Sequence, residues 1–240
     1  MIPAVIHQTA RVKELTWEER RLANRLRRML PGWSYNLYDD ADNLRLMAEN
    51  FPQYVDAYQA IRFGVARADI ARVLYLHLWG GFYFDTDYKL VRPFDDDLLT
   101  AKCVIPLEHV RDEPKYPDVS DEVVELGNCI MGSVPAYPLW ADFIRYVFDT
   151  KHPERITDPA EIIPATGPES LTWFYLERKA DYPEVVLPAK NLFHPDIKTL
   201  GMFTSAGKRT YGIHFHWGSW RGKPPLIAAR TLLRRKINAF

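Results

Sequence analysis

Between Ala68 and Leu78 the chain is apolar nearly all round a helical projection, which is typical of a helix buried in a core. Asp69 and Arg72 interrupt this run, and their spacing of three residues places both side chains on one face of the helix. The glycines at 80 and 81 then end the helix, because glycine adopts left-handed backbone conformations without steric cost. The pattern therefore predicts a buried helix with two charged side chains on one face.

A short aromatic strand is expected directly after the two glycines. Phe82, Tyr83 and Phe84 have strand propensity and lead into Asp85 and Asp87. Alternate side chains of an extended chain point the same way, so the two aspartates would project together from the strand end. Two carboxylates aimed at one place repel each other unless a cation lies between them. Oxygen ligands of this kind suit a hard divalent ion, Mg²⁺ or Mn²⁺, that phosphate oxygens also help to bind.

Strands and helices alternate along the rest of the chain, which predicts an α/β fold with a mostly parallel central sheet flanked by helices. A capping box at Thr16 and Glu19 opens one helix. Further helices are expected at 41–50, 52–62 and 137–150, and strands at 3–8, 35–38 and 104–107. Residues 108–127 are charged, contain prolines and lack clear periodicity, so they are expected to form a surface loop over the cleft.

Composition narrows the class of protein. The 240 residues carry no formal net charge, which argues against a general nucleic-acid binder. Cys103 and Cys129 are too few for a disulfide framework and lack zinc-like spacing, so we expect buried free thiols in a reducing compartment. The absence of internal repeats, low-complexity segments and linkers predicts a single domain over residues 1–240. In an α/β fold with a mostly parallel sheet, ligands collect at the carboxyl ends of the strands, and this is where Asp85 and Asp87 would lie.

The spacing of these residues resembles the signature of the DXD-containing sugar-nucleotide glycosyltransferases. That family includes fungal initiating α-1,6-mannosyltransferases, α-1,4-galactosyltransferases and bacterial capsular-polysaccharide transferases, and the large glucosylating toxins are more distant relatives. A lone DXD occurs by chance in most chains, whereas the joint pattern across helix, turn and strand is specific. The plainer alternative is a buried Asp69–Arg72 ion pair beside a solvated acidic turn, which leaves the glycine pair and the paired aspartates unexplained. The matching residues are Ala68-Asp69-Ile70-Ala71-Arg72, Leu76, Gly80-Gly81, Tyr83 and Asp85-Thr86-Asp87.

Three other segments resemble the family more weakly. His7 and Gln8 match a segment that lies near the nucleotide in relatives, although Ala10 stands where relatives usually carry a tryptophan that can stack on the base. His7 is equally well explained as a core histidine bonded to backbone groups. Asn128 matches an asparagine that approaches the donor sugar, and an asparagine after glycine is also ordinary turn chemistry. Gly167 precedes a helix that would aim backbone N–H groups at the cleft, or it simply begins that helix.

The segment from 213 to 220 resembles the end of the family's catalytic domain, where a histidine, an aromatic residue and Ser-Trp fold back to the metal. This register makes His214 a metal ligand and places Ser219 and Trp220 over the diphosphate. His214 and His216 alternate with apolar residues, so both would face one side of a strand, about 6–7 Å apart. A single ion can hardly be ligated by both without bending the strand, so we interpret His216 as structural.

The resemblance implies a single catalytic domain of the glycosyltransferase A type, which transfers a sugar from a nucleotide-diphosphate sugar to an acceptor hydroxyl of a glycan or glycolipid. Asp87 would bind Mn²⁺ or Mg²⁺ directly, and Asp85 would contact the ribose and donor sugar and also the metal through water. Asp69 and Arg72 would hold sugar hydroxyls and phosphate. The family retains anomeric configuration and no nucleophile is evident, so we expect attack on the face that the diphosphate leaves, with the leaving group as base.

The chain's ends bear on its location. No signal-peptide pattern opens the sequence and no apolar run approaches about 18 residues, so we expect a cytoplasmic protein or a chain separated from the membrane anchor that many eukaryotic relatives carry. Residues 225–240 predict a basic amphipathic helix. Such a helix could rest on anionic lipid at the inner face of a membrane, or pack on its own domain.

Two other functions remain open at this stage. A haloacid-dehalogenase-type phosphatase also has Asp-x-Asp after a strand, but residues 89–91 offer no threonine at the position that this motif normally requires. A catalytically inactive carbohydrate-binding relative would fit the loss of the tryptophan at Ala10. The donor sugar, its base, the acceptor and the oligomeric state are not determined by the sequence.

Overall fold

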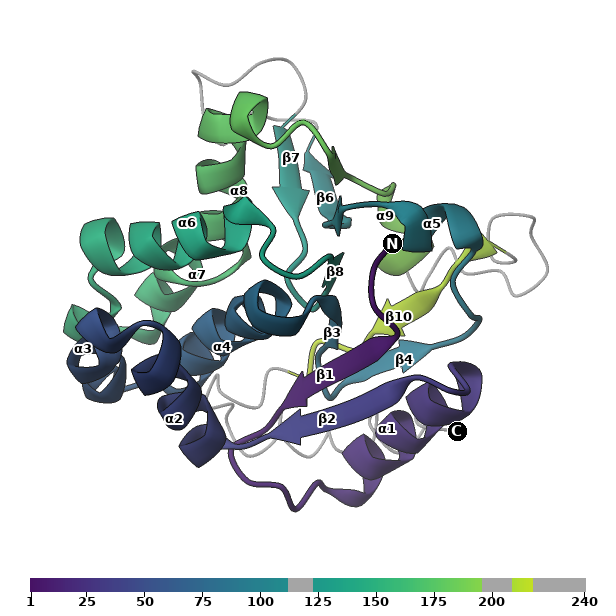
Figure 1. The fold of residues 1–240 in the computed structure, drawn as a ribbon, viewed down its shortest axis with the longest axis horizontal. Coiled ribbons are helices and arrows are strands. Elements are labelled where there is room, and N and C mark those ends of the chain that lie inside the picture. Colours follow the sequence, from purple (N-terminus) through teal and green to yellow (C-terminus); the bar gives the residue numbers. More distant parts are fainter. Residues whose placement is uncertain (112–122, 196–208, 218–240) are drawn as a thin grey trace.

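The protein is described by a computed structural model, which covers residues 1–111, 123–195 and 209–217 (Figure 1). Its centre is a six-stranded mixed sheet in the order β2-β1-β3-β8-β5-β9. β1 runs parallel to β2 and β3, β8 is antiparallel to β3 and β5, and β9 is parallel to β5. The predicted mostly parallel sheet is therefore confirmed. The strands are β1 (Val5–Thr9), β2 (Ser34–Tyr38), β3 (Gly81–Phe84), β5 (Cys103–Val104), β8 (Ile130–Ser133) and β9 (Val185–Val186).

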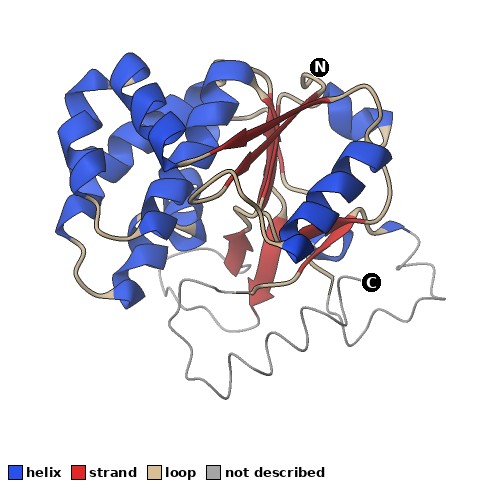
Figure 2. Ribbon diagram, turned by 90° about the horizontal axis from the view of Figure 1, so that it is seen from below, coloured by secondary structure: helices blue, strands red, loops and turns tan. Residues whose placement is uncertain are grey.

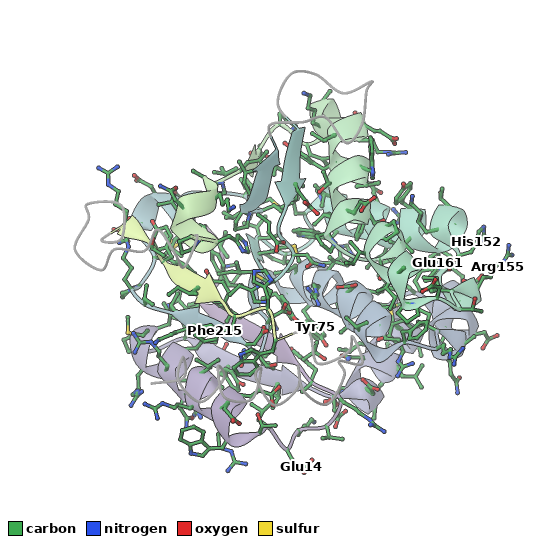
Figure 3. All side chains as sticks on the ribbon, turned by 180° about the vertical axis from the view of Figure 1, so that it is seen from behind. Glu14, Tyr75, His152, Arg155, Glu161 and Phe215 are labelled. Atoms are coloured by element: carbon green, nitrogen blue, oxygen red, sulfur yellow. The ribbon has the colours of Figure 1, made fainter. Side chains whose placement is uncertain are left out.

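Helices cover both faces of this sheet (Figures 1 and 2). The larger layer contains α2 (Asp40–Asn50), α3 (Val55–Ala60), α4 (Gly64–Trp79), α6 (Pro138–Tyr146), α7 (Ile162–Ala165) and α8 (Pro168–Arg178). The other layer contains α1 (Trp17–Met29), α5 (Asp96–Thr100) and α9 (Lys190–Phe193). Figure 3 shows His152, Arg155 and Glu161 at the outer edge of the larger layer, far from Phe215 near the sheet.

Two hydrophobic cores form because neighbouring strand residues point to opposite faces. In β3, Tyr83 is buried in the core of the larger layer, which we call the α4 core. Phe82 and Phe84 are buried in the opposite core with Leu26 of α1, which we call the α1 core. Because both faces of β3 are covered by a hydrophobic core, every side chain of the strand is buried, and the strand is therefore apolar throughout.

The helix–turn–strand unit forms as the sequence predicts. α4 is buried over most of its length, including Asp69 and Arg72. Gly80 and Gly81 have φ of +62° and +88°, and a Cβ on Gly81 would lie 2.5 Å from the carbonyl oxygen of Val5. Only glycine combines this backbone conformation with so close an approach to β1.

The predicted capping box is also confirmed. Thr16 Oγ1 accepts a hydrogen bond from the N–H of Glu19, and the Glu19 carboxylate accepts one from the N–H of Thr16. Helix α1 begins at the next residue and buries Leu22 and Leu26. These reciprocal bonds satisfy two N–H groups that the first helical turn would leave unpaired.

The prediction of a loop over residues 108–127 is wrong at both ends of that segment, which form strands. β6 (Leu107–Arg111) pairs antiparallel with β7 (Val123–Leu126), and residues 112–122 lie outside the described part of the chain. The expected strand at 104–107 is divided, because Pro106 has no N–H for a ladder and separates β5 from β6. Antiparallel pairing with each other stabilises these consecutive strands without the apolar alternation that the prediction required.

Besides the β6–β7 pair, a second two-stranded sheet contains a segment from late in the chain. β10 (Gly212–His214) pairs antiparallel with β4 (Tyr88–Leu90), so that His214 lies opposite Tyr88. This pairing brings the C-terminal segment to the loop that contains Asp85 and Asp87. In Figure 1 β10 is the yellow arrow beside β4.

The structure also bears on the expected helix at 137–150, the two cysteines and the expected C-terminal helix. Helix α6 ends at Tyr146 and continues as one π-helical turn, Val147–Lys151, instead of reaching residue 150 as an α-helix. Cys103 and Cys129 are buried free thiols, as expected. No helix in the described ranges is both long enough and apolar enough to cross a membrane. The expected helix at 225–240 lies outside the described residues.

Candidate functional site

Asp85 and Asp87 follow the carboxyl end of β3 and line a cavity of about 860 Å³. This is the edge of the sheet at which ligands of open α/β folds collect. Side chains from α4, β6, the segment before β8, the end of β10 and the residues after β10 also reach the cavity. Those that the site uses are Asp69, Arg72, Glu108, Asn128, His214 and His216.

Asp85 is fixed from the protein core. Its carboxylate accepts a hydrogen bond of 2.6 Å from the Tyr83 hydroxyl and lies 3.5 Å from Arg72 Nη2. Its N–H donates to the carbonyl oxygen of Cys129, and its own carbonyl accepts from the Gln8 side chain. Burial raises the pKa of Asp85, and the positive charge of Arg72 opposes that rise.

Asp87 is fixed from the C-terminal segment. Its Oδ2 accepts a hydrogen bond of 2.8 Å from the N–H of Trp217, and its Oδ1 lies 3.0 Å from His214 Nε2. Its carbonyl accepts from the N–H of Phe215. Burial acts to raise the pKa of Asp87, but the His214 and Trp217 contacts outweigh it and hold that pKa below its usual range.

The two aspartates and His214 fit a divalent cation. One ligand atom from each of the three residues lies within 4.8 Å of the others, and His214 Nε2 is 3.6 Å from Asp85 Oδ2. Two carboxylates that face each other in a partly buried site favour a cation between them. Oxygen donors with one imidazole suit Mn²⁺, and Mg²⁺ accepts the oxygen donors. The donor set therefore fits the metal that the sequence predicts.

Asp69 and Arg72 are the centre of a buried hydrogen-bond network. Arg72 Nη2 lies 3.1 Å from Asp69 Oδ1, and Arg72 Nη1 donates to the carbonyl oxygen of Asn128. Asp69 also accepts bonds of 3.0 Å from Asn128 Nδ2 and from Thr166 Oγ1. Burial raises the pKa of Asp69, and Arg72 opposes that rise. The pair is thus a buried ion pair that also faces the cavity, so the two readings of the sequence do not exclude each other.

Two predicted substrate-binding residues lie behind the site. His7 is fully buried between Gly80, whose carbonyl accepts from Nε2 at 2.8 Å, and Tyr38, whose hydroxyl donates to Nδ1. Gln8 connects the Tyr35 hydroxyl to the backbone of Asp85. Neither lines the cavity, so through these contacts they support Asp85 and the glycine turn from one layer further in.

Of the other predicted substrate-binding residues, one lines the cavity, one lies beside it, and two are not described by the structure. Asn128 lines the cavity and holds Asp69. Gly167 precedes α8 without lining the cavity, whereas its neighbour Pro168 does line it. Ser219 and Trp220 lie outside the described residues.

The prediction that His214 and His216 share one face of a strand is wrong. β10 ends at His214, and His216 has a φ of +49°, so the chain turns back instead of continuing extended. The two ring centroids are only 3.9 Å apart, and His216 Nδ1 lies 3.8 Å from Glu108 Oε1. His216 therefore reaches the same cavity as His214.

Sequence reasoning missed Glu108 and the role of Tyr83. Glu108 lies on β6, in the stretch expected to be a loop, and burial raises its pKa. No motif marks it. The sequence predicts Tyr83 as part of the aromatic strand and of the family pattern, and its position two residues before Asp85 indicates that both side chains face the same side of the strand.

Comparison with known proteins agrees with this geometry. Residues 16–105 match the family described as a glycosyltransferase sugar-binding region containing the DXD motif. Inositol phosphoceramide mannosyltransferase 2 of Schizosaccharomyces pombe is 27% identical over 184 residues, which cover 76% of this chain and 49% of that protein. Mannosyl phosphorylinositol ceramide synthase SUR1 of Saccharomyces cerevisiae is 26% identical over 185 residues, which cover 75% of this chain and 43% of that protein. The chain thus spans about half the length of these relatives.

A solved structure supports the fold. PaToxG glycosyltransferase superposes with a TM-score of 0.54 at 14% identity, over 74% of this chain and 70% of that one. At this identity the likeness concerns the fold alone, and it confirms the glycosyltransferase A architecture. Residues 16–105 of this chain therefore match the sugar-binding region of the DXD glycosyltransferases, and the mannosyltransferase relatives support the same family.

Proposed function

We propose that the protein is a metal-dependent, retaining glycosyltransferase that moves a sugar from a nucleotide-diphosphate sugar to an acceptor hydroxyl. The observation that carries this proposal is the convergence of Asp85, Asp87 and His214 on one cavity of about 860 Å³. A cavity of this size has room for a drug-sized ligand, for which the usual range is roughly 300–1,000 Å³. The family gives the reaction class, and the cavity supports a nucleotide-sugar donor.

Mannose is the first donor sugar to test, and a glycolipid is the first acceptor class. The two fungal relatives are named for mannosyl transfer and for inositol phosphoceramide. Because the chain matches only about half of each, donor and acceptor remain proposals that a panel has to decide.

The chain's own residues hold the reacting groups. Asp85, Asp87 and His214 would hold Mn²⁺ or Mg²⁺, which when bound neutralises the charge that develops on a departing diphosphate. Arg72 and Tyr83 keep the Asp85 carboxylate in one orientation, and Trp217 does the same for Asp87. Fixed donors and acceptors of this kind cost no reorganisation at the moment of reaction.

Asp69 and Asn128 are placed to bind sugar hydroxyls. Asp69 borders the cavity although three protein groups already bond its carboxylate, so its position is rigid. For retention, the acceptor hydroxyl attacks the face from which the diphosphate leaves, and the departing phosphate oxygen takes its proton. Glu108 faces the same cavity and can accept a hydrogen bond from a hydroxyl of donor or acceptor.

A donor panel tests the proposal. Purified full-length chain is incubated with GDP- and UDP-sugars, Mn²⁺ and an inositol-phosphate glycolipid, and nucleoside diphosphate release is measured with the Asp87→Asn variant as the blank. Release with one donor, dependent on Asp87 and abolished by chelator, supports a transferase. Phosphate release from a simple phosphomonoester, or tight donor binding without turnover, would instead indicate a phosphatase or an inactive relative.

A further inference from the structure

A second group of metal-ligand residues lies on the inner side of the site. His214 Nε2 contacts Asp87, but its other nitrogen, Nδ1, is buried and has no hydrogen-bond partner in the described part of the chain. Cys129 and His194 each place a ligand atom within 4.8 Å of the other and of a His214 ring nitrogen. An imidazole with one nitrogen unpaired and buried beside a thiol and a second imidazole has the surroundings of a ligand.

Three distant segments form this cluster. Cys129 lies directly before β8, His194 directly after α9, and His214 at the end of β10. Cys129 and His194 are only 1% and 5% exposed, whereas His214 also lines the cavity. Because the Cys129 carbonyl accepts the N–H of Asp85, the cluster lies immediately behind the first aspartate of the DXD motif. His214 is therefore the member of the cluster that borders the cavity.

The distances are close to those that zinc requires. Cys129 Sγ lies 3.9 Å from both ring nitrogens of His194. A tetrahedral Zn²⁺ with bonds of about 2.3 Å to sulfur and about 2.1 Å to nitrogen separates these ligand atoms by about 3.6 Å. A shift of a few tenths of an ångström with a rotation of the His194 ring would satisfy this geometry. Gly127 leaves the space for that ring, since a Cβ there would lie 2.5 Å from His194 Nε2.

The donor chemistry separates this cluster from the aspartate site. A thiolate with two imidazoles selects Zn²⁺, whereas the carboxylates of Asp85 and Asp87 suit Mn²⁺ and Mg²⁺. His214 belongs to both groups. A neutral imidazole offers one nitrogen lone pair, so this ring can ligate one ion at a time.

We propose that Cys129, His194 and His214 form an inhibitory zinc site that withdraws His214 from Asp85 and Asp87. Zn²⁺ binds the Cys129 sulfur as thiolate, the thiol proton passes to water, and the fourth coordination position remains for a solvent molecule. The existence of the zinc site is independent of the proposed transfer reaction, while its inhibitory effect rests on that reaction.

Cobalt is the probe for the binding site. Co²⁺ is added to the full-length chain, and thiolate-to-cobalt charge-transfer absorption is recorded in the near ultraviolet, a band that carboxylate ligands do not give. We expect the band with wild type, saturation at one ion per chain, and its loss on addition of Zn²⁺. Cys129→Ser should abolish the band, and Cys103→Ser, the matched buried thiol outside the cluster, should keep it.

Two further measurements keep the assignment falsifiable. Asp87→Asn should retain the band, because Asp87 is not part of this cluster. X-ray absorption of the zinc-loaded wild type should show a sulfur ligand at about 2.3 Å, and this result needs no variant to fold. A wild type without the band, a band of equal strength in Cys129→Ser, or a zinc spectrum without sulfur would overturn the site.

Inhibition is then measured in the Mn²⁺-supported transfer assay, with each variant compared with its own zinc-free rate. Cys129→Ser should require at least about tenfold more Zn²⁺ for half inhibition than wild type or Cys103→Ser. Equal sensitivity of all three would show that zinc acts only at the aspartates. If no donor supports turnover, the cobalt and absorption results still decide the site, so failure of the proposed function is distinguishable.

Discussion

At the scale of single residues, the two aspartates of the DXD motif are held by different parts of the molecule. Asp85 is bonded by Tyr83 and Arg72, which belong to the α4 core and its helix. Asp87 is bonded by His214 and Trp217, which arrive only when the C-terminal segment folds back. Asp85 is therefore oriented by the centre of the fold, and Asp87 by the pairing of β10 with β4.

Replacing Asp87 tests the metal site directly. Asp87→Asn keeps the shape and the bond from the Trp217 N–H but removes a charged oxygen ligand, so transfer should fall by about 100-fold or more while the fold survives. The measurement is turnover together with the thermal midpoint. Asp97→Asn, an exposed acid on α5, serves as the control and should retain activity. A folded Asp87→Asn variant with wild-type turnover would refute the metal assignment.

Replacing His214 and replacing His216 should have different effects on the Mn²⁺ concentration that half-maximal activity requires, although the two rings are adjacent. His214→Ala removes a nitrogen 3.0 Å from Asp87, so half-maximal activity should need more Mn²⁺, and excess Mn²⁺ should partly restore turnover. His216→Ala should change that requirement little, because its ring lies 3.8 Å from Glu108 Oε1 and is not part of the group that His214 forms with Asp85 and Asp87. Titration of Mn²⁺ against both variants decides between them, and the reverse order would assign the ligand to His216.

At the scale of elements, the sequence predicts a helix, turn or strand well where the contacts that form it join residues close together in the chain. The α4–turn–β3 unit is predictable because Gly80, Gly81 and the apolar run act over adjacent residues. The β6–β7 hairpin and Glu108 are not, because the ladder joins residues that carry no local apolar alternation. The turn at His216 is likewise invisible in a pattern that alternates as a strand does. Half of the site thus depends on pairing between segments more than 100 residues apart, as between Asp87 and His214.

The junction between β1 and α4 should make stability depend on pH. Burial lowers the pKa of His7 from 6.5 to about 4, and it outweighs the hydrogen bond to the Gly80 carbonyl, which acts to raise that pKa. The unfolded chain then binds more protons between these values, so stability present above pH 6.5 is lost as the pH falls towards 4. The loss should reach up to about 3 kcal/mol in the free energy of unfolding.

Urea denaturation at several pH values measures this contribution. His7→Gln keeps a hydrogen-bond donor but does not titrate, so its stability should depend less on pH over this interval than that of wild type. His152→Gln, at a partly exposed histidine at the outer edge of the larger layer (Figure 3), is the matched control and should leave the wild-type dependence unchanged. Identical pH dependence in His7→Gln and wild type would mean that another group causes the loss.

At the scale of the whole molecule, one sheet joins two cores that each hold a cysteine. Cys103 is buried in the α4 core and Cys129 in the α1 core, on opposite faces of the same sheet. The residues of the candidate site come from both sides, since Arg72 belongs to α4 and His214 to the β4–β10 pair. The two faces therefore have to be folded together for the site to exist.

Thiol labelling tests whether the two cores open together. Burial raises the pKa of Cys129 to about 12 and that of Cys103 well above its ordinary value, so neither thiol should react in the native fold. Cys103→Ser and Cys129→Ser each leave a single thiol, whose alkylation rate in chelator reports the opening free energy of one core. If unfolding is cooperative, each opening free energy should match that variant's own free energy of unfolding by urea to within about 1 kcal/mol.

A Cys129 that reacts far more readily than global unfolding allows would instead mean that the β4–β10 side opens alone. Asp87 would then lose its support while Asp85 kept its own, because the bonds to Asp85 from Arg72 and Tyr83 lie on the other face.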